Sequence, residues 1–373
     1  ITKNYSYFMN NQLKNVIFGF VIMIVASYVN YHRIVRLGWG WFWLLAAVAI
    51  IAALKTPLAH SELGATRWIK LGPVSFQAAE PIKAAIIIFF AYYVSYWGLN
   101  RWYNQLLACL LAIALLGFLF FFSNNLSTVI VLFCICAVII LSSVKKPDLY
   151  WYFLLGLALI IIAAIFVTVY LLMHQGAENF RFVRIRAWLH PEEYAADEGL
   201  QAMQARYAIG AGGFWGKGLG QSLIKFKLSY SYNDFILAII CEELGVFGVI
   251  VMMTLFGYLL YRIYKIAQNA WDIEGKVLAI GVFTQIALQL LINVMVVTSV
   301  IPTTGVTLPF FSAGGTSVVF LLAELGMVLN VDKYAKERRF FEEAERHVAQ
   351  MEQRGGIGAA GWRRRLDSAR TRR

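Results

Sequence analysis

Long apolar runs follow one another through most of the chain, and they restrict its fold more than any other feature. Nine runs are long enough to cross the roughly 30 Å hydrocarbon core of a bilayer as helices. They cover residues 13–30, 39–55, 79–97, 104–122, 126–143, 149–173, 234–262, 277–300 and 314–331. Charged residues make up 14% of the chain, compared with about 25% in a soluble domain. The sequence therefore predicts an all-α polytopic membrane protein with nine spans.

Basic residues gather between alternate apolar runs, and this pattern predicts the orientation of the chain. The positive-inside rule assigns the segments that hold Arg33, Arg101, Lys145, Arg262 and the tail to the cytoplasm. The C-terminus is then inside and Ile1 is outside. Because the sequence begins with Ile1 rather than methionine, we expect one further span before it and ten spans in the full protein.

We divide the chain into a transmembrane domain at residues 1–331 and a basic cytoplasmic tail at 332–373. The tail has a helical pattern to about Arg354 and is expected to lie on the anionic inner leaflet; a site for a cytoplasmic partner is the alternative. The net charge of +12 reflects the same loop bias and predicts contact with membrane lipids rather than with nucleic acid. All four cysteines lie in apolar runs without metal-site spacing to histidine, so no metal centre is predicted.

The longest polar segment, residues 174–233, is predicted to be a large structured extracytoplasmic loop. It is rich in aromatic residues, unlike a disordered linker, and residues 199–207 have the pattern of a short amphipathic helix. The glycine-dense run 210–220 either brings backbone close to a ligand or forms a flexible turn. The loop also carries basic residues that either contact lipid headgroups or bind phosphate; they include Arg184, Arg186, Arg206 and Lys217.

Two further outer segments carry polar residues next to apolar runs. Segment 56–83 ends with Glu80, Pro81 and Lys83, where Pro81 suits the first turn of a helix and Glu80 suits its positive end. Lys83 either extends to the headgroups or pairs with a carboxylate at the same depth, for which Asp234 is the candidate. Segment 301–317 combines prolines and glycines in an apolar setting, so we expect it to line or plug a cavity on the outer side.

Three carboxylates stand at the start of the run at 234–262. Asp234 lies at the boundary between water and membrane, and Glu242 and Glu243 follow about 12 Å further along a helix. Acids at that depth are costly without a partner. We expect a structural role for the two glutamates, with one of them bonded to Asn293 or Gln289; a proton path is the alternative.

Four motifs in series resemble the SEDS family (shape, elongation, division and sporulation proteins), the RodA and FtsW group. The sequence reads GATRWIKLGPVSFQxxExxK over 64–83, AIGAGGFWGKGLGxS over 208–222, NDFILAIICEELG over 233–245 and TGVTLPFFSAGGTS over 304–317. The resemblance covers the chain apart from the tail and implies ten spans. The chain departs from the family pattern at 78–79, 124–125, 232–233 and 312–313, so no second acid is expected at Asn125 and no histidine role at Tyr232.

The resemblance implies a peptidoglycan glycosyltransferase that polymerises lipid II at the outer face of the bacterial cytoplasmic membrane. It also implies a class B penicillin-binding protein as the partner that crosslinks the product. The family's essential acid falls on Asp234, its motif tryptophan on Trp68, and its glutamate and lysine on Glu80 and Lys83.

The chemistry of that reaction suggests further roles. A carboxylate must take the proton of the attacking hydroxyl, and Asp234 is placed to do so. Lys83 is expected to keep Asp234 ionised, and cations must stabilise the leaving diphosphate. A divalent cation, Mg or Mn, on Asp234 is an open alternative, and no other cofactor is predicted. The predicted substrate contacts are Arg67, Lys70, Arg184, Arg186, Arg206, Lys217 and Ser312, with Arg67 and the Arg184/Arg186 pair favoured.

Two other functions fit parts of the sequence. A lipid II flippase or other transporter would explain intramembrane acids such as Glu242, Glu243 and Glu324. Many transporters have inverted repeats, and no matching halves are found here. A non-enzymatic scaffold for the cell-wall machinery is the third hypothesis.

Overall fold

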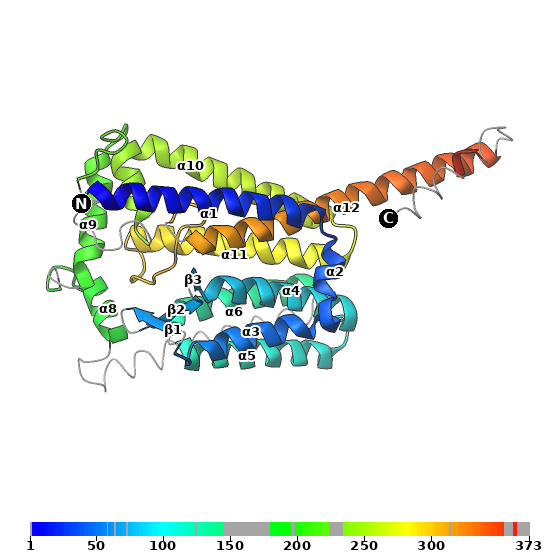
Figure 1. Cartoon of the computed structure of the whole chain (residues 1–373), viewed down its shortest axis with the longest axis horizontal. Helices are drawn as coiled ribbons and strands as arrows, with labels where there is room; N and C mark the ends of the chain where they lie inside the picture. The colour runs from blue at the N-terminus through cyan, green and yellow to red at the C-terminus, as the bar shows by residue number, and fades with distance from the viewer. Residues whose placement is uncertain are drawn as a thin grey trace.

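The computed structural model describes residues 2–57, 59–62, 65–71, 74–123, 125–144, 180–194, 198–223, 234–312, 315–353 and 361–363. The long helices lie side by side as a bundle, and shorter elements gather at its two ends (Figure 1). The loop end holds the start of α1 (Thr2–Tyr28), a small sheet, α8 (Phe180–Leu189) and α9 (Glu198–Gly212). The tail end holds α2 (Tyr31–Val35) and the extension of α12 (Gly315–Gln353).

Eight of the nine predicted apolar runs coincide with helices, and the remaining run, 149–173, lies outside the described residues. Five described helices, including α12, are long and apolar enough to cross a bilayer, and exposed side chains such as Leu110, Phe121 and Leu255 form the kind of apolar surface that lipid covers. The predicted helical membrane fold is confirmed, whereas the number of spans stays a prediction. Besides α12, these five helices are α5 (Trp102–Ser123), α6 (Leu126–Ser143), α10 (Ile236–Asn269) and α11 (Ile273–Val297). Two further helices of the bundle are α3 (Trp41–Ala53) and α4 (Ala79–Trp97).

A three-stranded antiparallel sheet corrects the all-α expectation. Its strands are β1 (Ala59–Glu62), β2 (Ala65–Leu71) and β3 (Val74–Gln77), in the order β1-β2-β3. Trp68 on β2 lies opposite His60 on β1 and Gln77 on β3. β2 contains the β-branched and aromatic residues that favour strands. Strands this short do not appear as long apolar runs in the sequence, although they lead directly into α4.

α4 lies inside the bundle, where protein rather than lipid surrounds it. Every residue from Ala85 to Val94 is buried, and α3, α6, α11 and α12 all pack against it. Polar residues at the start of α4 can therefore be buried against polar groups on other helices, which lipid could not supply.

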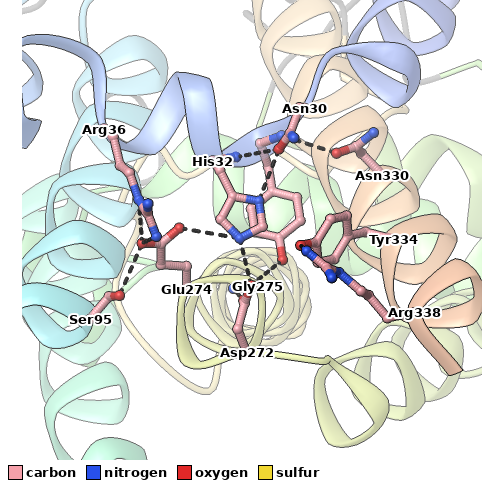
Figure 2. Close-up of polar contacts among 11 residues, drawn as sticks. Asn30, His32, Arg36, Ser95, Asp272, Glu274, Gly275, Asn330, Tyr334 and Arg338 are labelled. Carbon is pink, nitrogen blue, oxygen red and sulfur yellow. Dashed lines mark hydrogen bonds and ion pairs between the residues drawn. The ribbon is translucent and has the colours of Figure 1, made fainter. Parts of the chain in front are cut away.

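At the tail end, polar side chains from several elements meet around Asp272, which caps the N-terminus of α11 (Figure 2). Its carboxylate accepts hydrogen bonds from Tyr31 Oη at 2.6 Å, His32 Nε2 at 2.6 Å and the backbone N–H of Gly275 at 2.7 Å. His32 Nδ1 lies 2.9 Å from Asn30 Oδ1, an oxygen that also accepts the backbone N–H of His32. Both ring nitrogens of His32 therefore lie within hydrogen-bond distance of side-chain oxygens.

Glu274, in the first turn of α11, completes this group of charges. Its Oε1 accepts hydrogen bonds from Ser95 Oγ and Arg36 Nε, each at 3.0 Å, and its Oε2 lies 3.7 Å from His32 Nε2. These contacts join α2, α4 and α11 (Figure 2). We call Tyr31, His32, Arg36, Asp272 and Glu274 the tail-end cluster.

α12 continues past the bundle without interruption and projects beyond it at the tail end (Figure 1). The helix ends at Gln353, so the prediction of a helical pattern to about Arg354 is confirmed. The proposed boundary at residues 331 and 332 falls inside this helix and stays a prediction.

Candidate functional site

A buried ion pair stands at the loop end of α4. Helix α4 begins at Ala79, as Pro81 and Glu80 predicted, and Lys83 lies one turn further along. Lys83 Nζ contacts both carboxylate oxygens of Glu80 at 2.9 Å, and both side chains are 3% exposed. Burying two charges in a bundle is costly, so each of them depends on its partner.

The ion pair lines a small cavity of about 20 Å³. This volume has room for about one water molecule. Its wall comes from β3, α4, α6, α11 and the loop that follows α11, so segments from both halves of the chain meet there. The expectation that segment 301–317 lines a cavity is confirmed for its middle part. The lining residues include Gln77, Glu80, Lys83, Thr128, Gln289 and Thr307.

A row of buried amides on α11 connects this cavity to neighbouring elements. Gln285, Gln289 and Asn293 are spaced four residues apart and therefore share one face of the helix. Asn293 is completely buried and donates through Nδ2 to the carbonyl oxygens of Asp234, at 2.9 Å, and of Val306, at 2.8 Å. Because Val306 also lines the cavity, Asn293 holds the backbone of Asp234 beside the wall that contains Lys83.

Asp234 stands at the loop end, two residues before α10 begins. It is half-buried, so its carboxylate is placed between the protein interior and the surroundings. The position predicted from the sequence, at the start of a span, is the one observed. The residues before it, including Tyr232 and Asn233, lie outside the described part of the chain.

Lys83 does not have the partner that the sequence suggested. Its ion pair in the described structure is with Glu80, on the same helix, rather than with Asp234. A second buried acid, Glu324, lies on α12. Glu324 Oε2 accepts a hydrogen bond of 2.8 Å from Gln285 Nε2. Sequence analysis noted Glu324 as an intramembrane acid, but missed Gln285, whose spacing from Gln289 and Asn293 was the available signal.

The described parts of the long polar segment, α8 and α9, dock on the segment that follows α11. Trp188 Nε1 on α8 donates to Ser299 O at 2.8 Å, and Arg206 Nε on α9 donates to Ser299 Oγ at 2.9 Å. Arg184 Nη1 reaches Thr303 O at 3.5 Å. The predicted helix at 199–207 is confirmed as part of α9. These contacts give order to the parts of the loop that carry Arg184 and Arg206.

The other predicted substrate contacts are scattered around the loop end. Lys70 is exposed on β2 beside half-buried Trp68, whereas the side chain of Arg67 lies outside the described ones. Arg186 is half-buried on α8. Ser312 is 4% exposed, and its Oγ accepts the backbone N–H of Leu308 at 2.8 Å, which stabilises a turn.

Lys217 makes a different contact from the predicted one. Its Nζ lies 2.8 Å from Oε1 of Glu242, a carboxylate that is completely buried. This pairing weakens the case for Lys217 as a phosphate contact. It also corrects the partners that we expected for Glu242, since neither Asn293 nor Gln289 supplies them. Within the described residues, no group of three or more His, Cys, Asp or Glu is arranged to hold a metal ion.

Comparisons with known proteins agree with the motifs. A family model described as "Cell cycle protein", covering FtsW, RodA and SpoVE, matches residues 1–337. A "Probable peptidoglycan glycosyltransferase FtsW" from Trichlorobacter lovleyi is 32% identical over 87% of this chain and 84% of its own length. Stage V sporulation protein E from Bacillus subtilis is 45% identical over 42% of this chain and 43% of its own length.

Solved structures show the same fold. A chain from a peptidoglycan synthase complex superposes with a TM-score of 0.71 at 23% identity, covering 88% of this chain and 90% of the other. Rod shape determining protein RodA from Thermus thermophilus superposes with a TM-score of 0.62 at 22% identity, covering 88% of both chains. The matched residues span the helices, the sheet and the loop end described above, and the chain belongs to the FtsW, RodA and SpoVE family of cell cycle proteins.

Proposed function

We propose that this chain is a peptidoglycan glycosyltransferase that polymerises lipid II, with Asp234 as the general base. The observation that carries the proposal is the pair of hydrogen bonds from Asn293, which hold Asp234 beside the cavity of the Glu80–Lys83 pair. Membership of a family whose relatives are named as peptidoglycan glycosyltransferases supports the same reaction. The loop end then faces outward, and the C-terminus lies in the cytoplasm.

The proposed reaction forms one glycosidic bond and breaks one bond to phosphate. A sugar hydroxyl attacks the anomeric carbon of the lipid-linked sugar, and Asp234 takes the hydroxyl proton. The bond between that carbon and the diphosphate oxygen breaks, and the electron pair leaves with the diphosphate. Cations at the loop end stabilise this charge; we assign the role to Arg184 and Arg186, with Arg67, Lys70 and Arg206 as further contacts. A divalent cation on Asp234 would serve the same purpose.

The buried Glu80–Lys83 pair contributes a fixed dipole next to the reacting groups. Because Glu80 already neutralises Lys83, the lysine orients the cavity wall and its single water-sized space rather than ionising Asp234 directly. Trp68 and Ser312 support the same region through the sheet and the turn that contain them. The partner is a class B penicillin-binding protein, consistent with the peptidoglycan synthase complex among the similar structures.

The test is a polymerisation assay with purified full-length protein, its transpeptidase partner and labelled lipid II. We expect glycan polymer from the wild type and a loss of at least about 100-fold with Asp234→Asn, which removes the base while keeping its size. An Asp234→Asn protein that polymerises normally would refute the catalytic assignment. Movement of lipid II across vesicles without polymer would instead favour a transporter, the function that buried Glu324 and Gln285 suit best.

A further inference from the structure

Helix α10 is interrupted at Gly245, where φ is 67° and ψ is −170°. In a continuous helix the N–H of Val246 would bond to the carbonyl of Glu242, and that of Phe247 to the carbonyl of Glu243. The structure replaces both of these bonds. Val246 N donates to Gly213 O at 3.0 Å, and Phe247 N donates to Phe214 O at 3.1 Å.

The carbonyl oxygens released by the interruption are bonded by the same segment. Lys217 N donates to Glu242 O, and Gly218 N donates to Glu243 O, each at 2.9 Å. Four backbone groups of α10 thus find partners in residues 213–218, which insert where the helix opens. We call residues 212–223 the glycine loop. The interruption is energetically acceptable because the four backbone groups that lose their helical partners are bonded by this loop instead.

Glycine is required here by close approach between two backbones. A Cβ atom on Gly212 would lie 2.0 Å from Cys241 O, and one on Gly216 would lie 2.3 Å from Glu243 O. A Cβ on Gly245 would lie 2.4 Å from Gly216 N. The sequence suggested that the glycine run either approaches a ligand or forms a flexible turn. The structure shows a third use, in which the run packs against a helix.

Hydrogen bonds to the side chain of Glu242 stabilise this arrangement. Glu242 is completely buried, and its carboxylate accepts hydrogen bonds from Lys217 Nζ at 2.8 Å, Leu223 N at 3.2 Å and Ser222 Oγ. The neighbouring Glu243 is half-buried and accepts a hydrogen bond from Ser222 N at 3.3 Å. Glu242 therefore holds both the middle and the end of the glycine loop.

The first part of α10 lies between Asp234 and Glu242, which stands eight residues after the acid. Asn293 binds the backbone of Asp234 at the start of this part. Lys217 and the backbone N–H of Leu223, both in the glycine loop, bind the carboxylate of Glu242 at its far end. Contacts at both ends therefore fix the part of α10 that follows Asp234.

We propose that Glu242 is a positioning residue for the reaction, acting on Asp234 through the glycine loop. This inference rests on the proposed function of Asp234. Glu242 follows Asp234 by about two helical turns, on the order of 12 Å, so it acts through the loop rather than on the substrate. Its charge is balanced by Lys217, and its hydrogen bonds attach the glycine loop to α10.

The experiment compares Glu242→Gln, Lys217→Met, the double variant and the control Glu243→Gln in the full-length protein. Glutamine keeps the size of Glu242, but an amide accepts fewer bonds and leaves Lys217 without its counter-charge. We expect Glu242→Gln to lower kcat by about 10- to 100-fold with KM for lipid II changed less than about twofold, because misplaced groups cost rate rather than binding. Glu243→Gln should retain most of the activity.

The double variant separates loop placement from loss of the fold. Lys217→Met leaves Glu242 buried and uncompensated, so it should reduce both activity and thermal stability. Adding Glu242→Gln to it should restore stability without restoring kcat. If Glu242→Gln has the wild-type kcat, or loses activity only in proportion to a loss of folded protein, the positioning role is wrong.

Amide hydrogen exchange tests the glycine loop independently of activity. Val246 and Phe247 donate to the loop, so their exchange should accelerate in Glu242→Gln and stay slow in Glu243→Gln. If the wild type makes no polymer, the proposed function fails, and the exchange data alone decide whether Glu242 fixes the loop. Unchanged exchange at both amides in Glu242→Gln would overturn the inference whatever the activity.

Discussion

The two ends of the bundle each bury charged groups, but they use them differently. In the tail-end cluster, Asp272 accepts three hydrogen bonds and Glu274 Oε1 accepts bonds from two side chains. At the loop end, the ion pair of Glu80 and Lys83 borders a cavity. Nearby, the amide oxygens of Gln285, Gln289 and Asn293 have no hydrogen-bond partner among the described residues.

This difference separates a structural cluster at the tail end from a candidate functional site at the loop end. A cluster whose acceptors are mostly bonded by the protein itself holds elements together. Buried acceptors left without partners are rare in native proteins and call for water or a bound group. The loop end has several such acceptors near Asp234, whereas most acceptors of the tail-end cluster join α2, α4 and α11, and within that cluster Glu274 Oε2 alone lacks a hydrogen bond among the described residues. The substitutions below should therefore affect stability at both ends but activity at only one.

The largest effect is expected from Lys83→Met. It leaves Glu80 buried without a counter-charge, which should lower the free energy of unfolding by about 3–5 kcal/mol and abolish polymerisation. Thermal unfolding and the polymerisation assay measure the two effects. The double variant Glu80→Gln/Lys83→Met should regain stability but stay inactive, and a double variant with normal activity would show that the pair serves only the fold.

A smaller effect is expected from Asp272→Asn at the tail end. Burial alone would raise the pKa of Asp272, but hydrogen bonds from His32, Tyr31 and Gly275 hold it below its ordinary value. The stabilisation is therefore complete above the unfolded pKa of about 3.9 and is lost as the pH falls through the lower folded pKa. Asparagine keeps the helix cap but not the charge, so the neutral-pH cost should be about 1–2 kcal/mol.

Melting temperatures measured from pH 6 down to about pH 2 should show this difference. The wild-type curve should fall more steeply than the Asp272→Asn curve in the acid part of the range. Polymerisation at neutral pH should be unchanged, since Asp272 belongs to the tail-end cluster. Parallel curves would mean that Asp272 has the same pKa in both states, and lost activity would contradict the separation of the two ends.

The smallest effect is expected beyond the bundle, on the extension of α12. Lys336 and Asp332 form an ion pair at 2.6 Å in which the lysine side chain is 69% exposed. Exposed pairs at this spacing contribute little, so Lys336→Ala should change stability by less than about 0.5 kcal/mol. A markedly lower melting temperature in detergent would indicate that this part of α12 is buried against another molecule in solution.

Sequence patterns predicted the features that depend on local composition. Hydropathy located eight helices, although α1 begins well before its predicted apolar run and α10 and α12 end well after theirs. The helix-start signals of Pro81 and Glu80 were correct. The position of Asp234 followed from the same boundary. The amphipathic helix within α9 was also predictable, because its pattern is contained in a few turns.

Features that depend on distant partners were not predicted. Lys83 pairs with Glu80 on its own helix, and the backbone of Asp234 is bound by Asn293, a residue 59 positions later. Glu242 bonds to the glycine loop, 25 positions from Lys217, because the interruption at Gly245 opens α10 there. A glycine at position 245 is compatible with a continuous helix, and only the loop that inserts there explains its conformation.

The two hydrogen bonds of Asn293 have a consequence for how the protein is made. Asp234 is translated before Asn293, and Val306, which shares the same side-chain amide, follows thirteen residues after it. During insertion into the membrane, these two hydrogen bonds therefore cannot form until α11 is in place and the segment that follows it has folded back. A nascent chain that ends before α11 would carry Asp234 but lack the side chain that binds its backbone, so the role proposed for Asp234 requires the last helices to be inserted.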